Sequence, residues 1–239
     1  MTRRLRIGVD VGGTFTDVVA VDADTFDLVA QLKVPTTHRA SEGVARGIID
    51  GLGRMLADLG APPSAVVFIA HSTTQATNAL LEGDVAHVGI VGAGRRGERW
   101  KARLDTRVPP VPLAPGKTLQ AAHAFAAVDD ATTGAAAIEA AVRTLEQRGV
   151  EVIVASEAFA VDDPSVEKAI VAAARDKGLW ASSGHEVSSL YGLRTRTRTA
   201  VVNAAILPIM VRTASLTARA VADTGITAPL MIMRSDGGV

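Results

Sequence analysis

Apolar residues along the chain alternate between short runs and helical stripes, which is the pattern of an α/β protein. The apolar run at residues 5–11 ends at a pair of glycines, as a buried strand does when it enters a tight turn. Two more strands at residues 17–21 and 28–34 predict an antiparallel meander, and an amphipathic helix is expected over residues 41–59. Later strands are expected at residues 65–70, 85–91, 150–156, 179–182 and 230–233, and later helices at residues 74–82, 133–148, 164–177 and 201–222.

Two stretches interrupt this rhythm. Residues 92–118 are rich in arginine and then in proline, and we expect them to form an exposed loop or the edge of an insertion. Pro208 lies inside the last long amphipathic segment, where we expect it to kink the helix or delay its start.

Composition narrows the class of function. The 239 residues carry 25 basic and 25 acidic side chains, so phosphate-backbone binding is not the expected task and no nucleic-acid partner is predicted. There is no cysteine, which excludes disulfides, thiolate metal sites and cysteine nucleophiles. No uninterrupted apolar run approaches the ~20 residues of a membrane span. The pair Arg3-Arg4 is not followed by an export signal, so we expect a cytoplasmic protein without a membrane segment.

The most informative segment is the turn after the first strand, Asp10-Val-Gly-Gly-Thr-Phe-Thr-Asp17. Gly12 and Gly13 permit positive φ and let the backbone approach a ligand without a Cβ in between. Successive N–H groups in such a turn form an anion cradle. A plain hairpin, in which the glycines only satisfy the turn, is the alternative, but the added hydroxyls and carboxylates favour phosphate binding.

The polar side chains of this segment suit a metal–phosphate group. The hydroxyls of Thr14 and Thr16 are candidate donors to phosphate oxygens. Asp10 stands at the end of a strand, where one or two carboxylates hold hydrated Mg²⁺.

This segment resembles the first phosphate loop of the actin-like ATPases and, more narrowly, the N-terminal half of the hydantoinase A/5-oxoprolinase family. Further stretches match that family in type and order from one end of the chain to the other. In place of the family's usual Gly-Phe-Arg-Asp, however, this chain has the residues 94–100. The matching stretches are His71-Ser-Thr-Thr-Gln-Ala-Thr-Asn-Ala-Leu-Leu-Glu82, Gly149–Val154, Arg196–Asn203 with Pro208, and Met233-Arg-Ser-Asp-Gly-Gly238.

The resemblance implies an α/β fold: an actin-like, ribonuclease H-like ATPase lobe with an inserted α/β domain. The expected limits are residues 1–70 for the first part of the lobe, 71–190 for the insertion, and 191–239 for the helix and strand that return to the lobe. It also implies ATP and Mg²⁺ as cofactors, with Gly12, Gly13, Thr14 and Thr16 on phosphate. Asp10 is the expected metal ligand, and Asp10 and Asp17 are the expected catalytic pair in the Mg²⁺ shell or on the acceptor. The second ATPase lobe is expected beyond residue 239.

By the same resemblance, the parent protein would phosphorylate the amide oxygen of a small cyclic amide (a hydantoin, an oxoproline or another lactam) so that water opens the ring. A hydantoinase B-type partner subunit would usually complete the hydrolysis. The alternatives are a ketone-activating carboxylase subunit, another actin-like small-molecule kinase, and a non-catalytic lobe that binds nucleotide or a partner. The chain alone, with half of the pocket, is expected to be inactive.

The stretch after the fourth expected strand is the candidate substrate pocket. His71, Thr73 and Thr74 lie between a strand and a helix, where α/β proteins place ligand contacts, and Asn78 lies on that helix. An equally open interpretation is structural: the hydroxyls cap the helix, with Thr74 as the cap, and the histidine packs at the end of the strand.

Three weaker motifs complete the survey. Gly92-Ala-Gly94-Arg-Arg-Gly97 matches a dinucleotide fingerprint, but no acidic strand end follows about twenty residues later, so a nicotinamide site is not expected. The arginines that alternate with threonine over residues 194–198 form either a phosphate-binding edge or a solvated strand or linker. The segment Ser235–Gly238 is either a second anion nest or a flexible end.

Overall fold

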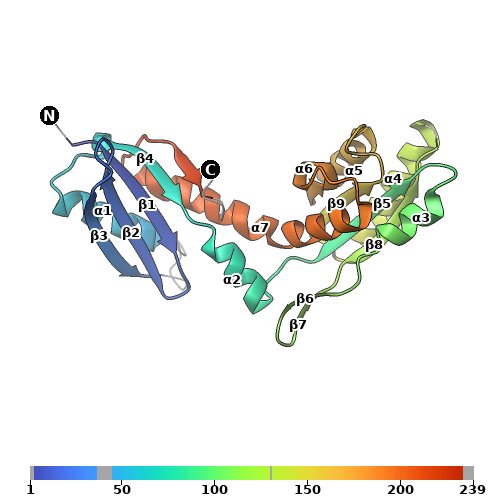
Figure 1. Ribbon diagram of the computed structural model, residues 1–239, viewed down its shortest axis with the longest axis horizontal. Helices are drawn as coiled ribbons and strands as arrows, with labels where there is room; N and C mark the ends of the chain where they lie inside the picture. The colour runs from blue at the N-terminus through green and yellow to red at the C-terminus, as the bar shows by residue number, and fades with distance from the viewer. Residues whose placement is uncertain (1–2, 37–44, 130, 234–239) are drawn as a thin grey trace. The chain divides into compact units, whose positions relative to one another are not determined.

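The computed structural model describes residues 3–36, 45–129 and 131–233 (Figure 1). The chain divides into two compact units. Unit 1 comprises residues 1–78 and 209–239, and unit 2 comprises residues 79–208. The sequence-based limits, after residues 70 and 190, both lie earlier in the chain than these two crossing points.

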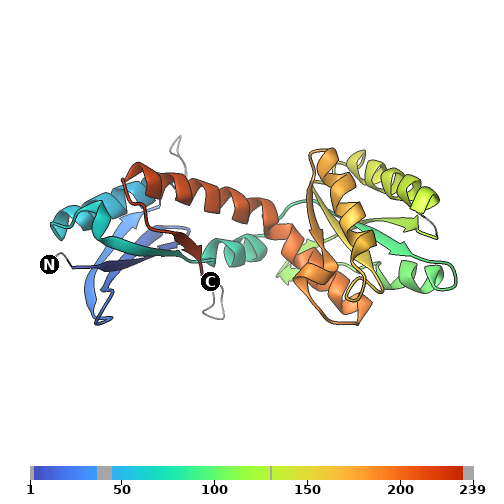
Figure 2. The ribbon, with the colours of Figure 1, turned by 90° about the horizontal axis from the view of Figure 1, so that it is seen from above.

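Unit 1 is a mixed five-stranded sheet in the order β11-β4-β1-β2-β3. The hairpin pairs β1–β2 and β2–β3 are antiparallel, whereas β4 runs parallel to β1 and β11 runs parallel to β4 (Figure 2). The antiparallel meander predicted from the first three apolar runs is confirmed. The strands are β1 (Leu5–Val11), β2 (Phe15–Asp22), β3 (Leu28–Pro35), β4 (Val66–His71) and β11 (Leu230–Ile232).

Helices cover one face of this sheet. Helix α1 (Ala45–Asp58) lies against β2 and β3, and its buried residues share a core with the C-terminal part of α7 (Leu193–Asp223). The predicted start of α1, near residues 41–42, lies outside the described residues. The strand residues that face this core alternate along β1, as the period of two requires. The core is built from Leu5, Ile7, Val9, Val11, Val18, Ala20, Ile48, Leu52, Met55, Leu56, Val66, Ile69, Ala220, Val221 and Ile226.

Unit 2 is built on a parallel four-stranded sheet in the order β10-β9-β5-β8. Helices α4 and α5 lie side by side on one face (Figure 2), and the N-terminal part of α7 packs on the other. A separate β6–β7 hairpin, helix α3 and the short helix α6 complete the unit. The strands are β5 (Val88–Gly94), β6 (Val111–Ala114), β7 (Lys117–Leu119), β8 (Ala122–Ala127), β9 (Val152–Glu157) and β10 (Trp180–Ser183), and the helices are α3 (Arg99–Asp105), α4 (Ala131–Glu146), α5 (Ser165–Asp176) and α6 (Gly184–Val187).

Of the two alternatives predicted for residues 92–118, an exposed loop or the edge of an insertion, the exposed loop is wrong. The segment holds the end of β5, helix α3 and the β6–β7 hairpin. The prolines do not prevent pairing, because Pro112 stands in a short two-stranded ribbon and Gly116, at φ +75°, supplies its turn. Strand β8 escaped prediction as well, since its alanine-rich sequence has little apolar contrast.

Helix α7 starts earlier than predicted and runs through Pro208 without a break in its assignment. The arginines at 194–198 therefore lie on a helix, not on a strand or linker. By length and hydropathy α7 would be able to cross a membrane. This is weak evidence for a membrane span, because its ends contribute to two protein cores and it buries the polar side chains of Arg196, Thr197 and Thr217.

Candidate functional site

A row of polar side chains crosses the open face of the unit 1 sheet near the ends of β1 and β4. Asp10 and Asp17 stand directly opposite each other in the antiparallel β1–β2 pair. Lys33 is the next residue in the row, in register with Asp17 on β3, and its Nζ lies 3.3 Å from Asp17 Oδ1. On the other side of β1, the Ser72 hydroxyl donates to Asp10 Oδ1. Asp10 therefore lies between a hydroxyl donor and a second carboxylate.

The turn between β1 and β2 is closed by backbone hydrogen bonds. The Gly12 N–H donates to the Phe15 carbonyl at 2.9 Å, and the Thr36 N–H donates to the Thr14 carbonyl at 2.9 Å. Gly12 and Gly13 permit positive φ, but neither residue adopts it in the structure. Close approach explains the first glycine, since a Cβ on Gly12 would stand 3.0 Å from the Phe15 carbonyl oxygen.

Gly13 and Thr14 form the accessible front of this turn. Both residues are exposed, and no heavy atom lies within 4 Å of the position that a Cβ on Gly13 would take. Among the described residues other than its two chain neighbours, no side chain therefore fills the space beside Gly13. Asp10, which is also exposed, stands two residues before Gly12 on the same turn.

Thr16 and His71 lie on the covered face of the sheet, unlike the two aspartates. Thr16 is opposite Val11 and fully buried, and its hydroxyl bonds that of Thr36 at 3.1 Å. Thr36 in turn donates to the Gly12 carbonyl at 2.9 Å. Thr16 therefore braces the turn from behind. Its position follows from the alternation of strand side chains, which sends neighbours to opposite faces.

His71 is 1% exposed and pairs in register with Val9. Its Nδ1 donates to the Ser72 carbonyl, and its buried Nε2 has no hydrogen-bond partner within the described part of the chain. Burial lowers the pKa of His71, against smaller opposing effects of the Ser72 carbonyl and of Asp10. The histidine is therefore neutral near pH 7, with Nε2 as an acceptor.

The remaining predicted site residues surround the start of α2 (Thr74–Glu82), whose bounds match the prediction. Thr74 is the first helical residue, not the cap, and its hydroxyl donates to Ser72 Oγ at 3.2 Å. A chain of hydroxyls thus runs from Thr74 through Ser72 to Asp10. Thr73 precedes the helix and Asn78 is half-buried in its second turn.

Sequence reasoning missed Ser72 and Lys33 as members of the row. Ser72 was visible only as the neighbour of His71, and Lys33 only as one polar residue in an edge strand. Their place beside the aspartates depends on strand register, which no local pattern in the sequence reveals.

The dinucleotide-like glycines of unit 2 have a packing role. A Cβ on Gly92 would stand 2.2 Å from Thr106 Oγ1, and one on Gly94 would stand 3.0 Å from the Ala102 Cβ. Both glycines are still within β5 and allow α3 and the residue after it to pack closely on the strand. Asp129, shortly after the next parallel strand, is paired with Arg99. The Ser235–Gly238 segment lies outside the described residues.

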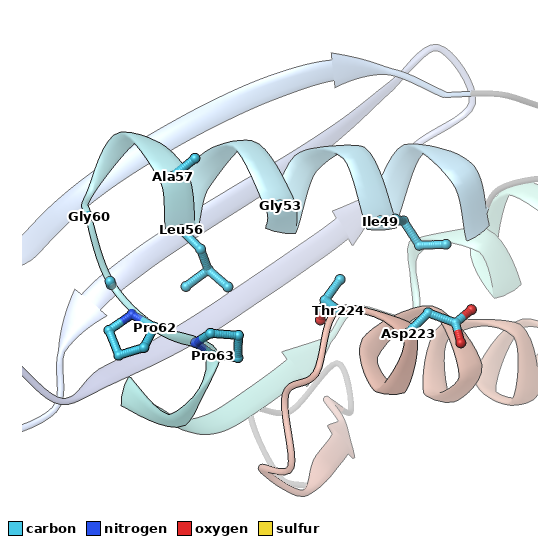
Figure 3. A pocket seen from close by; sticks show the side chains of 10 residues that line it. Ile49, Gly53, Leu56, Ala57, Gly60, Pro62, Pro63, Asp223 and Thr224 are labelled. Atoms are coloured by element: carbon cyan, nitrogen blue, oxygen red, sulfur yellow. The ribbon is translucent and has the colours of Figure 1, made fainter.

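A cavity of about 660 Å³ in unit 1 is an unsuitable catalytic site. It lies between the C-terminal half of α1, the Gly60–Pro63 turn and the end of α7, and Figure 3 shows Leu56, Pro62 and Pro63 gathered at one end. Its lining is mainly apolar, and none of the predicted site residues belongs to it. Within the described residues, no group of three or more His, Asp and Glu side chains is placed to hold a metal ion. One or two carboxylates with phosphate oxygens suffice for Mg²⁺.

The mixed sheet of unit 1, with its antiparallel hairpin and acidic glycine turn, defines the class: the chain has an α/β fold of the actin-like ATPase type. Residues 6–178 match the hydantoinase/oxoprolinase N-terminal region, and residues 196–239 match hydantoinase/oxoprolinase. The chain belongs to the hydantoinase/oxoprolinase family. The family resemblance and the fold class predicted from the sequence are confirmed.

Individual relatives agree with this assignment. The chain is 30% identical to the alpha subunit of caprolactamase from Pseudomonas jessenii, with 99% of the chain and 36% of the relative covered. It is similar to the crystal structure of the ATP-dependent caprolactamase from the same organism, with a TM-score of 0.67, 27% identity and coverage of 97% and 36%. Nucleotide-free acetone carboxylase matches with a TM-score of 0.69, 19% identity and the same coverage, which shows the fold alone. The chain thus spans 36% of the length of these relatives.

Proposed function

We propose that the chain is the N-terminal part of an ATP-dependent subunit that phosphorylates the amide oxygen of a small cyclic amide. The single observation that carries this proposal is the Asp10–Asp17 pair at the mouth of the Gly12-Gly13 turn. Membership in the hydantoinase/oxoprolinase family supports it, and the 30% identity to a caprolactamase subunit favours a lactam over a ketone as the substrate. The alternative, a ketone-activating subunit, is supported only by the similarity in fold to acetone carboxylase.

The residues present fit a magnesium–nucleotide complex. Asp10 is an exposed carboxylate at the end of a strand, and Gly13 in the adjacent turn is exposed to solvent. In the proposal Asp10 holds Mg²⁺, directly or through water, while Gly12, Gly13 and Thr14 contact phosphate. Bound Mg²⁺ would neutralise phosphate charge and fix the terminal phosphoryl group for in-line attack.

Asp17 and Lys33 set the electrostatics of this edge. Two carboxylates face each other at Asp10 and Asp17, and Lys33 compensates the second. This leaves the charge of Asp10 for a cation. In the proposed step the amide oxygen attacks the terminal phosphorus, and the bond from phosphorus to the bridging oxygen breaks. ADP leaves with the bridging oxygen, and the amide nitrogen gives its proton to solvent. Asp17 orients the acceptor, and the resulting imidate phosphate is open to attack by water at carbon.

The other predicted residues take supporting roles in this proposal. Thr16 braces the turn through Thr36 rather than contacting phosphate, because it is buried on the opposite face. His71, Thr73, Thr74 and Asn78 remain proposed substrate-pocket residues, with Thr74 acting on Asp10 through Ser72.

The proposal extends to the assembly. Unit 1 corresponds to the first ATPase lobe and unit 2 to the family's inserted domain. The second lobe, together with a hydantoinase B-type partner, would complete a cytoplasmic enzyme. On its own, the chain is proposed to bind nucleotide weakly and not to turn over substrate.

Calorimetric titration of the 239-residue chain with a non-hydrolysable ATP analogue, with and without Mg²⁺, tests the placement of the phosphate site. We expect Mg²⁺-dependent binding that is lost in Asp10→Asn and weakened in Thr14→Val. Asp24→Asn is the matched control, since Asp24 is an exposed carboxylate in the next turn of the same unit. Binding that needs no Mg²⁺, or that survives Asp10→Asn, would remove Asp10 from the site.

A further inference from the structure

The topology of unit 2 creates a second place where a ligand can bind. From β5 the chain passes to β8 on one side, and it then returns to β9 on the other side of β5. Strands β5 and β9 are parallel neighbours whose onward connections lead in opposite directions. In open parallel sheets, such a reversal parts the loops at the carboxyl ends of the two strands and leaves a crevice.

A buried carboxylate lies at this point. Glu157 is the last residue of β9, and its side chain is fully buried. Its Oε2 accepts a hydrogen bond from the Phe159 N–H at 2.9 Å, whereas its Oε1 has no hydrogen-bond partner among the residues that the structure describes. Arg95, directly after β5, forms a long ion pair with this carboxylate, and its Nε lies 3.9 Å from that oxygen. A buried acceptor without a hydrogen bond is costly to the fold, so its retention at a topological reversal points to a ligand donor.

Arg95 connects this carboxylate with a cavity of about 420 Å³. The cavity lies between the residues that follow β8 and the N-terminal halves of α4 and α5. Its volume suits a small organic molecule. Most of its wall is aliphatic, and its polar residues are few. The lining consists of Arg95, Val128, Asp129, Gly134, Ala135, Ile138, Ser165, Val166 and Ala169.

The charges around Arg95 favour a positively charged ligand group. Arg95 Nη2 lies 3.3 Å from Asp163, so one guanidinium serves two carboxylates, Asp163 and Glu157. Asp129 is already paired with Arg99. Glu98 adds another negative charge near Glu157. Arg196 is a second buried cation at this point, but its guanidinium donates to the main-chain carbonyls of Glu157 and Ala158. The carboxylates of Glu157, Asp163 and Glu98 still outnumber the two cations Arg95 and Arg196. An ammonium group would supply both a positive charge and an N–H donor for Glu157.

We propose that unit 2 binds a small primary amine, with its ammonium group on Glu157 and Asp163 and its aliphatic chain in the cavity beside Arg95. The site is separate from the phosphate turn, and its existence does not depend on the proposed ATP chemistry. The shared chemistry is an ammonium group on a short alkyl chain. A simple amine and an amino acid both carry it, and in the amino acid Arg95 would also meet a carboxylate.

Ligand-observed NMR and calorimetry on the 239-residue chain test this assignment with three probes of matched length. They are n-pentylamine, 5-aminopentanoate and pentanoate. We expect n-pentylamine to bind and pentanoate not to bind. Tighter binding of 5-aminopentanoate than of n-pentylamine would identify an amino-acid site, and the reverse order would identify a site for simple amines.

Three substitutions test whether the amine binds in this crevice. Glu157→Gln keeps the size of the side chain and an acceptor for the Phe159 N–H but removes the charge, so amine affinity should fall at least tenfold. Ala169→Phe should block the cavity without disturbing the core, because Ala169 is exposed on α5. Glu139→Gln, on α4 but outside the lining, is the matched control. Thermal melting confirms that each variant is folded.

Three results would overturn the proposal. The first is the absence of saturable amine binding up to roughly 10 mM, a concentration at which even a weak ligand binds. The second is equal binding of pentanoate and n-pentylamine. The third is full amine affinity in a folded Glu157→Gln protein. None of them bears on nucleotide binding at Asp10, so this proposal and the proposed function fail independently.

Discussion

Asp10 and Asp17 face each other across β1 and β2, with the Ser72 hydroxyl on one side of the pair and Lys33 on the other. Like charges directly opposite on neighbouring strands are destabilising. Of these two carboxylates, only that of Asp17 has a cation within ion-pair distance among the described residues. Within that part of the chain, the charge of Asp10 has no cationic partner, which is why we propose Asp10 as the ligand of a cation.

Replacing Asp10 should change nucleotide affinity without lowering the free energy of unfolding. In Asp10→Asn the repulsion from Asp17 disappears while an oxygen remains to accept from Ser72. We expect the free energy of unfolding to stay constant or rise by about 0.5 kcal/mol, while Mg²⁺-dependent nucleotide binding is lost. Urea denaturation and calorimetry measure the two effects. A loss of stability above about 1 kcal/mol would mean that Asp10 has a mainly structural role.

The two glycines of the turn should respond differently to alanine. A Cβ at residue 12 crowds the Phe15 carbonyl oxygen at 3.0 Å, so Gly12→Ala should cost about 1 kcal/mol of stability. Gly13→Ala meets no atom within 4 Å and should change stability by less than about 0.5 kcal/mol. It should nevertheless weaken nucleotide binding, because the new methyl group stands where phosphate approaches. Equal nucleotide affinity in Gly13→Ala and the unchanged chain would argue against phosphate at this position.

Arg196 should be among the most sensitive positions of unit 2. Its guanidinium is buried and donates to the carbonyls of Leu190, at 2.6 Å, and of Glu157 and Ala158. Arg196→Met leaves these acceptors without their donor and should lower the free energy of unfolding by about 3 kcal/mol.

The matched control is Arg198→Met, an exposed position on the same helix, which should stay within about 0.5 kcal/mol of the unchanged chain. Chemical denaturation of both variants measures the two changes in the free energy of unfolding. Equal effects at the two positions would show that the buried hydrogen bonds contribute little.

His123 should make unit 2 less stable in acid. Burial, followed by the charges of Arg107 and Arg103, lowers its pKa from the ordinary 6.5 to about 4. Above pH 6.5 the ring is neutral in both the folded and the unfolded chain, so it has no effect on the pH dependence. As the pH falls from 6.5 to 4, the unfolded chain binds a proton that the folded chain does not, and stability decreases.

The variant His123→Gln removes this proton uptake. As the pH falls from 6.5 to 4, the free energy of unfolding of the variant should therefore increase relative to that of the unchanged chain. Denaturation at a series of pH values measures it. A difference that does not change with pH would show that His123 titrates normally.

The local pattern of apolar and polar residues was enough to predict the bounds of the elements in which apolar and polar positions contrast strongly. The bounds of β1 and α2 are those predicted, because a buried strand ending at two glycines and a capped amphipathic helix are encoded in neighbouring residues. Strand β8 and the segment from 92 to 118 were missed, since alanine-rich strands lack contrast and the prolines suggested a loop. The early start of α7 was missed because the alternation of arginine and threonine resembles a strand until tertiary packing buries every third or fourth residue.

The sequence by itself determined the family, the α/β class and the acidic glycine turn, because each of these is written in contiguous residues. Only the tertiary structure decided which side chains share that site. Strand alternation and register place Thr16 and His71 on the covered face, while they bring Ser72 and Lys33 into line with Asp10 and Asp17. Register is set by packing across the whole sheet, and a shift of one residue reverses every side chain, so no local pattern could have assigned these residues to one face or the other.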